Sequence, residues 1–300
     1  SWFSLLLQLK GPIYEKIRYR LWIVVLSSAI VTTMYELCIT SGQMLSMTPF
    51  SLIGLALSIF LGFRNNTSYD RFWEGRKLWG GIVNTSRTLT RRVLTLINED
   101  ETSDNQRRVK MIAGYVHLLR QHLRGEWNKT EVEHLLDSEV LTALEHEHNR
   151  PIALLQRLAD DFRSEFVQQN IHPFHLTQLE DGLTDFTNLQ GGCERIRSTP
   201  IPFSYNVLLH RIVAIYCFTL PFGLAPVVDW FTPIVVALIG YAFLGIDAIG
   251  DEIEEPFGFD ANDLPLNALS TMIEYNVLQR LEGETLPDLK TPNPITRIMD

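Results

Sequence analysis

Four apolar stretches that lack charged side chains place the strongest constraint on what this chain can fold into. They comprise residues 21–35, 37–63, 212–228 and 230–246. The hydrocarbon core of a bilayer is about 30 Å thick and takes about 20 residues of helix, with a range of roughly 17–25. The first stretch reaches that length if Arg20 extends its charged end to the membrane surface. The pattern predicts four transmembrane helices in two hairpins, because four such stretches are difficult to bury in a soluble chain of 300 residues.

Basic residues are distributed unevenly around these stretches. They precede the first, follow the second and precede the third, at Lys10, Lys16, Arg18, Arg20, Arg64, Arg71, Arg76, Lys77, Arg195, Arg197 and Arg211. The connections between the first and second stretches and between the third and fourth carry no basic residue. By the positive-inside rule, both termini and residues 64–200 are expected in the cytoplasm.

The net charge of −9 is distributed unevenly along the sequence. Residues 1–98 carry +7, residues 99–199 carry −7, residues 200–246 are neutral and residues 247–300 carry −9. The three cysteines have no spacing typical of a disulfide framework or a metal site. Because the basic surplus is small and lies beside apolar sequence, the composition disfavours a nucleic-acid-binding protein.

Outside the apolar stretches the sequence predicts helices and no strand-rich region. Apolar residues recur at helical spacing at Val109, Ile112, Val116, Leu119 and Leu123. Prolines that interrupt helices follow at Pro151, Pro173, Pro200 and Pro202. We expect residues 1–63 to form an N-terminal segment and the first transmembrane hairpin, and residues 64–203 a cytoplasmic helical domain. Residues 204–246 then form the second hairpin, and residues 247–300 an acidic cytoplasmic C-terminal segment with an extended tail.

The second apolar stretch carries two stripes at helical spacing. Small residues recur every four positions at Gly54, Ser58 and Gly62. An apolar stripe lies one residue further on, at Leu55, Ile59 and Phe63. If copies of this helix surround an axis, the small residues pack on neighbouring helices, and the apolar stripe forms a constriction that gates ions by dewetting. The alternative is ordinary helix packing in which the apolar stripe faces lipid.

Possible metal ligands occur in two regions. The first follows the fourth apolar stretch and comprises Asp251, Glu254, Asp260 and Asp263. The second consists of His146 and His148, which alternate with glutamates. Carboxylates suit hard cations and imidazoles suit transition metals, so adventitious binding of a divalent metal is one interpretation. The alternatives are that the acids neutralise the basic residues at the membrane surface, and that the histidines belong to a solvated helix face.

Motifs of catalysis do not support an enzyme. The sequence has no HExxH, no GxSxG and no glycine loop of the phosphate-binding type. The remaining distinctive segments are SIFLGFRNNTSYDRFWEGRKLWG at 58–80, Ile201-Pro202, and FLGIDAIGDEIEEPFG at 243–258. In this order and together they resemble the bestrophin family, and the chain is identified as a prokaryotic bestrophin homologue.

The resemblance implies an all-α membrane protein with four transmembrane helices and a cytoplasmic helical domain, assembled as a homopentamer around a central pore. In such an assembly the second helix lines a hydrophobic neck, at positions that correspond here to Leu55, Ile59 and Phe63. A second constriction lies at the cytoplasmic exit, for which Ile171 and Phe174 are both candidates. The implied location is the bacterial inner membrane.

The resemblance also bears on the permeant ion. Animal bestrophins conduct chloride and bind calcium at an acidic clasp after their Pro-Phe-Gly motif. Here the five residues after that motif hold only two acids, Asp260 and Asp263, so calcium activation is not expected and no cofactor is required. Five copies at −9 each total −45, which favours small monovalent cations such as sodium. The alternatives are a chloride channel, as in animal members, and a divalent-metal-binding membrane transporter or scaffold.

Overall fold

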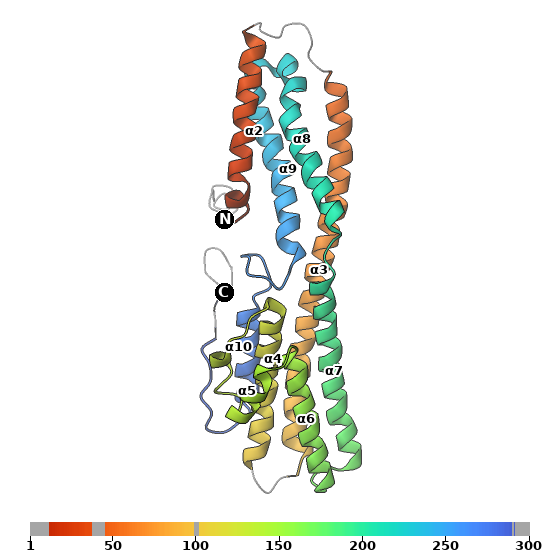
Figure 1. The fold of residues 1–300 in the computed structure, drawn as a ribbon, viewed down its shortest axis with the longest axis vertical. Helices are drawn as coiled ribbons and strands as arrows, with labels where there is room; N and C mark the ends of the chain where they lie inside the picture. The colour runs from red at the N-terminus through yellow and green to blue at the C-terminus, as the bar shows by residue number, and fades with distance from the viewer. Residues whose placement is uncertain (1–11, 38–45, 99–101, 290, 292–300) are drawn as a thin grey trace. The chain divides into compact units, whose positions relative to one another are not determined.

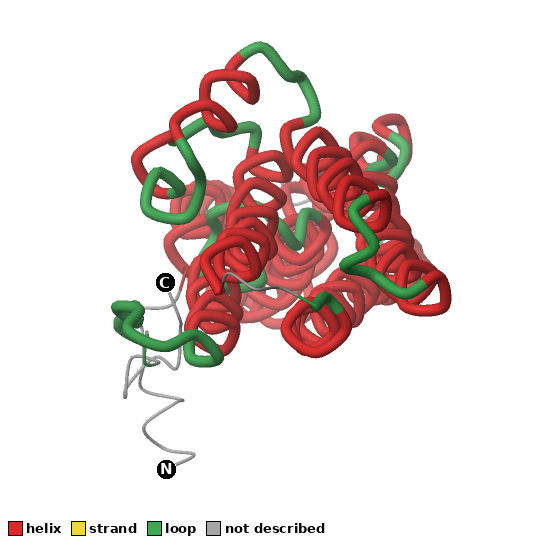
Figure 2. The backbone as a smooth tube through the Cα atoms, turned by 90° about the horizontal axis from the view of Figure 1, so that it is seen from below, coloured by secondary structure: helices red, strands yellow, loops and turns green. Residues whose placement is uncertain are grey.

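The computed structural model describes residues 12–37, 46–98, 102–289 and 291. Within these residues the chain is helical, as Figure 2 shows, and its single β-type pairing is an isolated bridge between Ile97 and Ile171. The expected all-helical fold is therefore confirmed for the described part of the chain.

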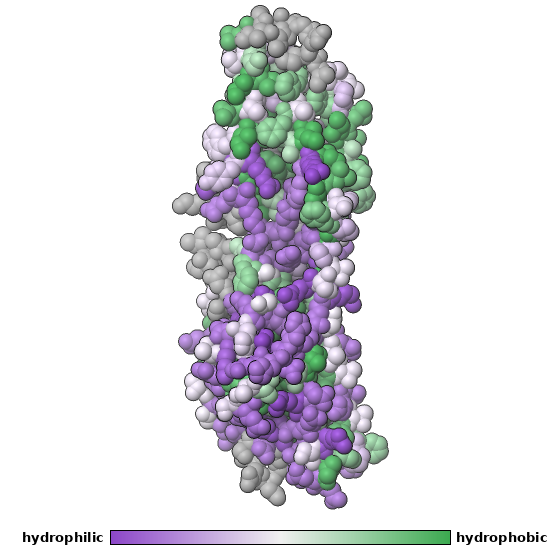
Figure 3. Space-filling model, in the orientation of Figure 1, coloured by the Kyte–Doolittle hydropathy of each residue, from purple (hydrophilic) through white to green (hydrophobic). Residues whose placement is uncertain are grey.

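The helices group into two compact units. The apolar unit contains the described residues within 1–72 and 200–255, and the polar unit those within 73–199 and 256–300. One long helix, α3 (Met47–Leu96), contributes residues 47–72 to the first unit and residues 73–96 to the second. Hydrophobic residues cover much of the visible surface of the apolar unit, and hydrophilic residues dominate that of the polar unit (Figure 3).

The apolar unit packs three helices beside the first part of α3. These are α2 (Pro12–Glu36), α8 (Phe203–Val228) and α9 (Thr232–Glu254), which contact one another and lie side by side in Figure 1. Their shared core includes Val24, Leu61, Cys217, Leu220 and Val236. The core is narrow, and many large apolar side chains around it remain exposed, as on a helix bundle that meets lipid.

Among the described residues, three helical stretches are long and apolar enough to cross a membrane, by length and composition. They are Ile13–Glu36, Met47–Leu96 and Phe203–Glu254. The last contains both α8 and α9, which are separated by the single turn η2 (Asp229–Phe231). The turn begins at Asp229, whose φ of +48° breaks the helical path. Residues 21–35, 47–63, 212–228 and 232–246 of the four predicted apolar stretches lie in α-helices, whereas residues 38–45 lie outside the described part.

In the polar unit, α4 (Thr102–Arg124) lies among several other helices. They are η1 (Lys129–Glu131), α5 (Ser138–Glu145), α6 (Arg150–Val167), α7 (Pro173–Ser198) and α10 (Leu266–Leu278). The apolar positions expected to share one face of α4 are all buried. Prolines mark the starts of α6 and α7, because a missing amide donor is tolerated in the first helical turn.

Candidate pore helix

The first part of α3 buries one narrow stripe against its own chain. Leu57, Leu61 and Arg64 are 2%, 1% and 1% exposed, and they recur at helical spacing. The predicted neck residues lie on the other side of the helix. Leu55, Ile59 and Phe63 are 63%, 51% and 63% exposed. These three side chains point away from the core of their own chain and are available to line an axis or to face lipid.

Exposure alone does not single out the neck stripe. Leu52, Ile53 and Phe60 are also large, apolar and exposed on this part of α3. The helix is therefore covered by its own chain along one stripe and left uncovered around most of its circumference. Such a surface is suited to lipid, to a neighbouring copy or to a pore.

The small residues Gly54 and Gly62 have different surroundings within the chain. A Cβ added at Gly54 would lie 2.6 Å from Tyr216 Oη of α8, so this glycine allows close packing within the chain. Ser58 donates a hydrogen bond to the Gly54 carbonyl oxygen at 2.7 Å. A Cβ at Gly62 would meet no atom within 4 Å. Gly54 thus packs on α8 of its own chain, and the packing of Ser58 and Gly62 on a neighbouring helix stays a prediction.

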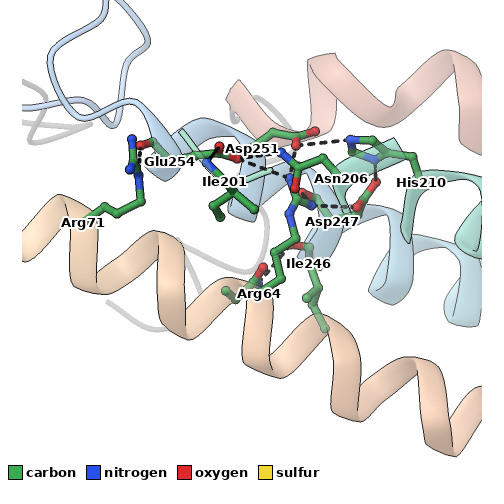
Figure 4. Close-up of polar contacts among 10 residues, drawn as sticks. Arg64, Arg71, Ile201, Asn206, His210, Ile246, Asp247, Asp251 and Glu254 are labelled. Atoms are coloured by element: carbon green, nitrogen blue, oxygen red, sulfur yellow. Dashed lines mark hydrogen bonds and ion pairs between the residues drawn. The ribbon is translucent and has the colours of Figure 1, made fainter. Parts of the chain in front are cut away.

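Arg64 stands at the end of the exposed apolar stripe and is itself buried. Its Nη1 donates hydrogen bonds to Asp247 Oδ1 at 2.9 Å and to the Asp247 carbonyl oxygen at 3.2 Å. Its Nη2 pairs with Asp251, and Glu254 Oε2 lies 3.9 Å from the same nitrogen. Figure 4 shows α9 presenting these carboxylates toward α3. Charges buried at this depth are tolerated when they are paired and hydrogen-bonded.

The same cluster holds the beginning of α8. The Glu254 carboxylate accepts hydrogen bonds from the Ile201 amide at 2.9 Å and from Asn206 Nδ2 at 3.0 Å. His210 Nδ1 lies 2.7 Å from Asp247 Oδ2 (Figure 4). The buried charge cluster, which we define as Arg64, His210, Asp247, Asp251 and Glu254, therefore ties α3, α8 and α9 together. The acids after the fourth apolar stretch neutralise basic residues here, in line with one of the two interpretations considered for them.

The expected metal ligands are only partly brought together. His210, Asp247 and Asp251 offer ligand atoms within 4.8 Å of one another, and no other group of three of this kind occurs among the described residues. Of the residues named from sequence, this group includes Asp251 alone. The Arg64 guanidinium already binds both of its carboxylates, so a cation would compete with an internal positive charge.

The remaining predicted ligands lie elsewhere. Glu254 belongs to the buried charge cluster without joining the group of three. Asp260 and Asp263 share a loop after α9, where the Asp260 amide donates to Asp263 Oδ2 at 2.7 Å. His146 and His148 are exposed near the end of α5. Metal binding by these residues stays a prediction.

The two candidates for the cytoplasmic constriction differ sharply in exposure. Ile171 is 2% exposed and pairs with Ile97, so its side chain belongs to the core of the polar unit. Phe174 is 77% exposed in the first turn of α7, where the His172 side chain accepts a hydrogen bond from the Phe174 amide. Of the two, Phe174 has the side chain that can reach an axis without rearrangement of the core.

Two carboxylates that the sequence reasoning did not single out share a stripe with Phe174. Gln178, Asp181 and Asp185 follow it at spacings of four, three and four residues, which places all four side chains along one line of α7. All are exposed, and neither aspartate has an ion-pair partner among the described residues. The signal in the sequence was the helical spacing of acids after an aromatic residue.

Comparisons with known proteins agree with one another. A family model described as bacterial and fungal bestrophin protein matches residues 1–279. A protein from Ralstonia nicotianae named voltage-dependent anion channel-forming protein is 38% identical over 96% of this chain and 94% of its own length. A protein of the same name from Salmonella typhi is 35% identical over 97% of this chain and 95% of its own length.

A solved structure also resembles the fold. It is a bacterial bestrophin homologue from Klebsiella pneumoniae, with a TM-score of 0.83 and 34% sequence identity. The match covers 88% of this chain and 97% of that chain. The likeness therefore includes most of both units described above.

Proposed function

The chain belongs to the bacterial and fungal bestrophin family, and on that premise we propose that it forms a homopentameric ion channel in the bacterial inner membrane. The family and the names of the relatives indicate a channel and not an enzyme. The first part of α3 lines the pore, and Leu55, Ile59 and Phe63 form the neck.

The observation that carries this proposal is the exposure of the neck stripe. One face of α3 is buried on its own chain and the opposite apolar side is bare. A single helix cannot enclose a pore, but several copies of it around an axis can. Their neck side chains would then form stacked apolar rings, which control ion passage by excluding water.

The membrane topology follows from the same helices. We place α2, the first part of α3, α8 and α9 across the bilayer, with both termini and the polar unit in the cytoplasm. The flanking arginines and lysines support this orientation. The exposed surface of residues 47–63, 212–228 and 232–246 carries no charged side chain and is compatible with lipid, where an exposed charged surface would be costly.

For selectivity we favour small monovalent cations such as sodium. Many acids of residues 247–254 are paired inside the apolar unit, so the total of −45 overstates the charge that faces the pore. The support comes instead from Asp181 and Asp185, which share the exposed stripe with Phe174. If Phe174 lines the exit, five copies bring ten carboxylates to the vestibule wall and concentrate cations there.

Anion conduction is the second candidate function. It is favoured by one specific observation, namely that relatives matching nearly the whole chain are named voltage-dependent anion channel-forming proteins. The neck side chains carry no formal charge, so the neck itself does not discriminate between the two signs of ion.

The oligomer is tested by its mass. Five chains of 34.4 kDa weigh about 172 kDa, and native mass spectrometry of the detergent-purified protein reads this value directly. A stable assembly of a different copy number would refute the pentameric pore.

Selectivity is tested by the reversal potential in planar bilayers under a sodium chloride gradient. A cation channel makes the dilute side positive at zero current, and an anion channel makes it negative. The double variant Asp181→Asn, Asp185→Asn is expected to move the reversal potential toward zero, because it removes the carboxylates that attract cations. Glu139→Gln, which removes an exposed acid from α5, serves as the matched control and is expected to leave it unchanged. A dilute side that is negative in the unaltered protein would support the anion channel instead.

A further inference from the structure

A basic hollow lies on the polar unit. Its volume is about 410 Å³, and its lining includes Arg87 and Arg91 of α3 and Arg280, which follows α10. All three side chains are exposed, and none of the three guanidinium groups has a carboxylate partner among the described residues. Three positive groups around one hollow repel one another unless an anionic group enters it.

The basic hollow and α7 lie on opposite sides of α3. A Cβ added at Gly192 of α7 would lie 2.7 Å from Leu78 of α3, and one at Gly182 would lie 2.9 Å from Leu89, so these leucines mark the side that packs on α7. Arg87 comes nine residues after Leu78 in one continuous helix. At about 100° per residue, nine residues correspond to about two and a half turns, which places Arg87 on the side away from α7.

A second hollow, with an acidic residue in its wall, lies beyond α7. It measures about 270 Å³ and is lined by α6 and α7, including Ile152, Leu155, Leu183 and Glu180. Glu180 precedes Gly182 by two residues and so points about 200° away from the contact with α3. It has no ion-pair partner among the described residues, and burial raises the pKa of its carboxyl above the usual value.

We infer that the basic hollow of one copy receives the α6–α7 face of the next copy, so that Glu180 pairs with Arg87 and Arg91 across the interface. The inference deepens the proposed pentamer and rests on it. The carboxylate and the guanidinium groups match in charge and in hydrogen-bonding geometry. Neither group can find the other within one chain, because α3 and α7 separate the two faces.

The placement of the two faces also fixes the kind of assembly. When two different surfaces on opposite sides of a subunit meet, the contact is head-to-tail, and repetition of such a contact gives a closed ring when the rotation between copies closes and an open filament when it does not. A two-fold contact between identical faces would instead place arginines against arginines. The region formed by α3, α6 and α7 would then hold neighbouring copies together in the ring. It would also position α7 at the axis of the ring.

A charge exchange tests the inference in the full-length, detergent-purified protein. Arg91→Glu and Glu180→Arg are each expected to reduce the pentamer fraction in native mass spectra about tenfold at equal protein concentration. The double variant R91E/E180R is expected to restore it, because the pair is re-formed with its charges reversed. Arg163→Glu, which reverses an exposed arginine on α6, is the matched control and is expected to leave the pentamer intact.

Each alternative outcome is distinguishable. If the unaltered protein is not a pentamer, the proposed function fails first. If it is a pentamer and both single variants also remain pentamers, or the double variant is not restored, the inferred pairing is wrong. The isosteric Glu180→Gln guards against misfolding, since it retains the shape of the side chain and is still expected to weaken assembly. If pyrophosphate raises the melting temperature of the unaltered pentamer but not that of an intact R91E pentamer, the hollow binds a small anion and the interface is overturned.

Discussion

The two parts of α3 meet different surroundings although they belong to one helix. Residues 47–72 bury a single stripe and expose large apolar side chains such as Leu52, Leu55 and Phe63. Residues 73–96 bury Trp79, Ile82, Leu89 and Val93, and their exposed positions are mostly polar or charged. Exposing apolar surface to water costs about 25 cal/mol per Å². The second part is therefore suited to water, whereas the first part requires lipid, a neighbouring copy or a dewetted pore.

The difference extends to how each part uses charge. In the first part, the arginine that ends the apolar stripe is buried and fully committed to acids of α9. In the second part, Lys77, Arg87 and Arg91 are exposed and have no carboxylate partner among the described residues. A basic residue in the first part of α3 thus stabilises the fold. The exposed basic residues in the second part are available for contacts with other chains. The predictions below test this contrast, in order of decreasing effect.

The largest effect is expected for Arg64→Ala. Removing the guanidinium leaves the buried Asp247 carboxylate with His210 but without its arginine partner, and breaking a buried pair costs about 3–5 kcal/mol. Thermal unfolding of the purified protein is expected to show a large loss of stability. Lys77→Ala, which removes an exposed charge from the second part of α3, is the control and is expected to change stability by less than about 0.5 kcal/mol. Equal effects of the two variants would contradict the contrast.

A smaller effect is expected for Gly54→Ala. The added methyl group would meet the Tyr216 hydroxyl at 2.6 Å, and overpacking of this kind costs about 1–3 kcal/mol. Gly62→Ala on the same helix has open space and is expected to leave the fold of the chain undisturbed. Combining Gly54→Ala with Tyr216→Phe removes the clashing oxygen and is expected to recover most of the loss. Melting temperatures of the four proteins measure this, and a failure of Tyr216→Phe to rescue would reject the contact.

The smallest effect concerns the polar unit and pH. The buried Glu274 carboxylate lies 2.7 Å from His117 Nε2 and 2.8 Å from His134 Nε2. Burial alone raises the pKa of Glu274, but the hydrogen bonds and the electrostatic attraction of His117 and His134 together outweigh it, so the pKa lies below its usual value of 4.5. The unfolded chain then binds the proton more readily, and stability falls as pH decreases through 4.5 toward the lower folded value.

Glu274→Gln is expected to flatten this part of the stability profile. Urea unfolding between pH 6 and 3, or melting temperatures over the same range, would record the slope. Asp185→Asn, which removes an exposed carboxylate without a partner, is the control and is expected to retain the slope. If the stability of both variants depends on pH in the same way, Glu274 is not the source of the loss of stability in acid.

Much of the fold was accessible from the sequence, because local patterns determine it. The helical spacing from Val109 to Leu123 predicted the buried face of α4, and Pro151 and Pro173 marked the starts of two helices. The stripe of Leu55, Ile59 and Phe63 was recognised as one face, and the structure places it on the exposed side of α3. Periodicity suffices for such features, since they depend on residues close together in the chain.

The features that the sequence did not reveal depend on distant residues. Arg64 pairs with Asp247, 183 positions later, and no local pattern indicates that this arginine is buried. Gly54 was grouped with Ser58 and Gly62 in a helix-packing stripe, but the sequence did not reveal that Tyr216 of α8 lies beside it. Ile171 and Phe174 were equivalent candidates until the bridge to Ile97 placed the former in the core. Long-range packing, and not composition, decides each of these cases.

In the proposed channel, the exposed apolar side of α3 lines an ion pore at Ile59. Single-channel recording of Ile59→Ala in planar bilayers tests it most directly, with Ile53→Ala as the matched control, because both residues are exposed isoleucines on different sides of the same helix. I59A is expected to raise conductance about twofold or more, since a smaller side chain widens and wets the constriction, whereas I53A is expected to leave it unchanged. Unchanged conductance in I59A, or an equal rise in both variants, would contradict it.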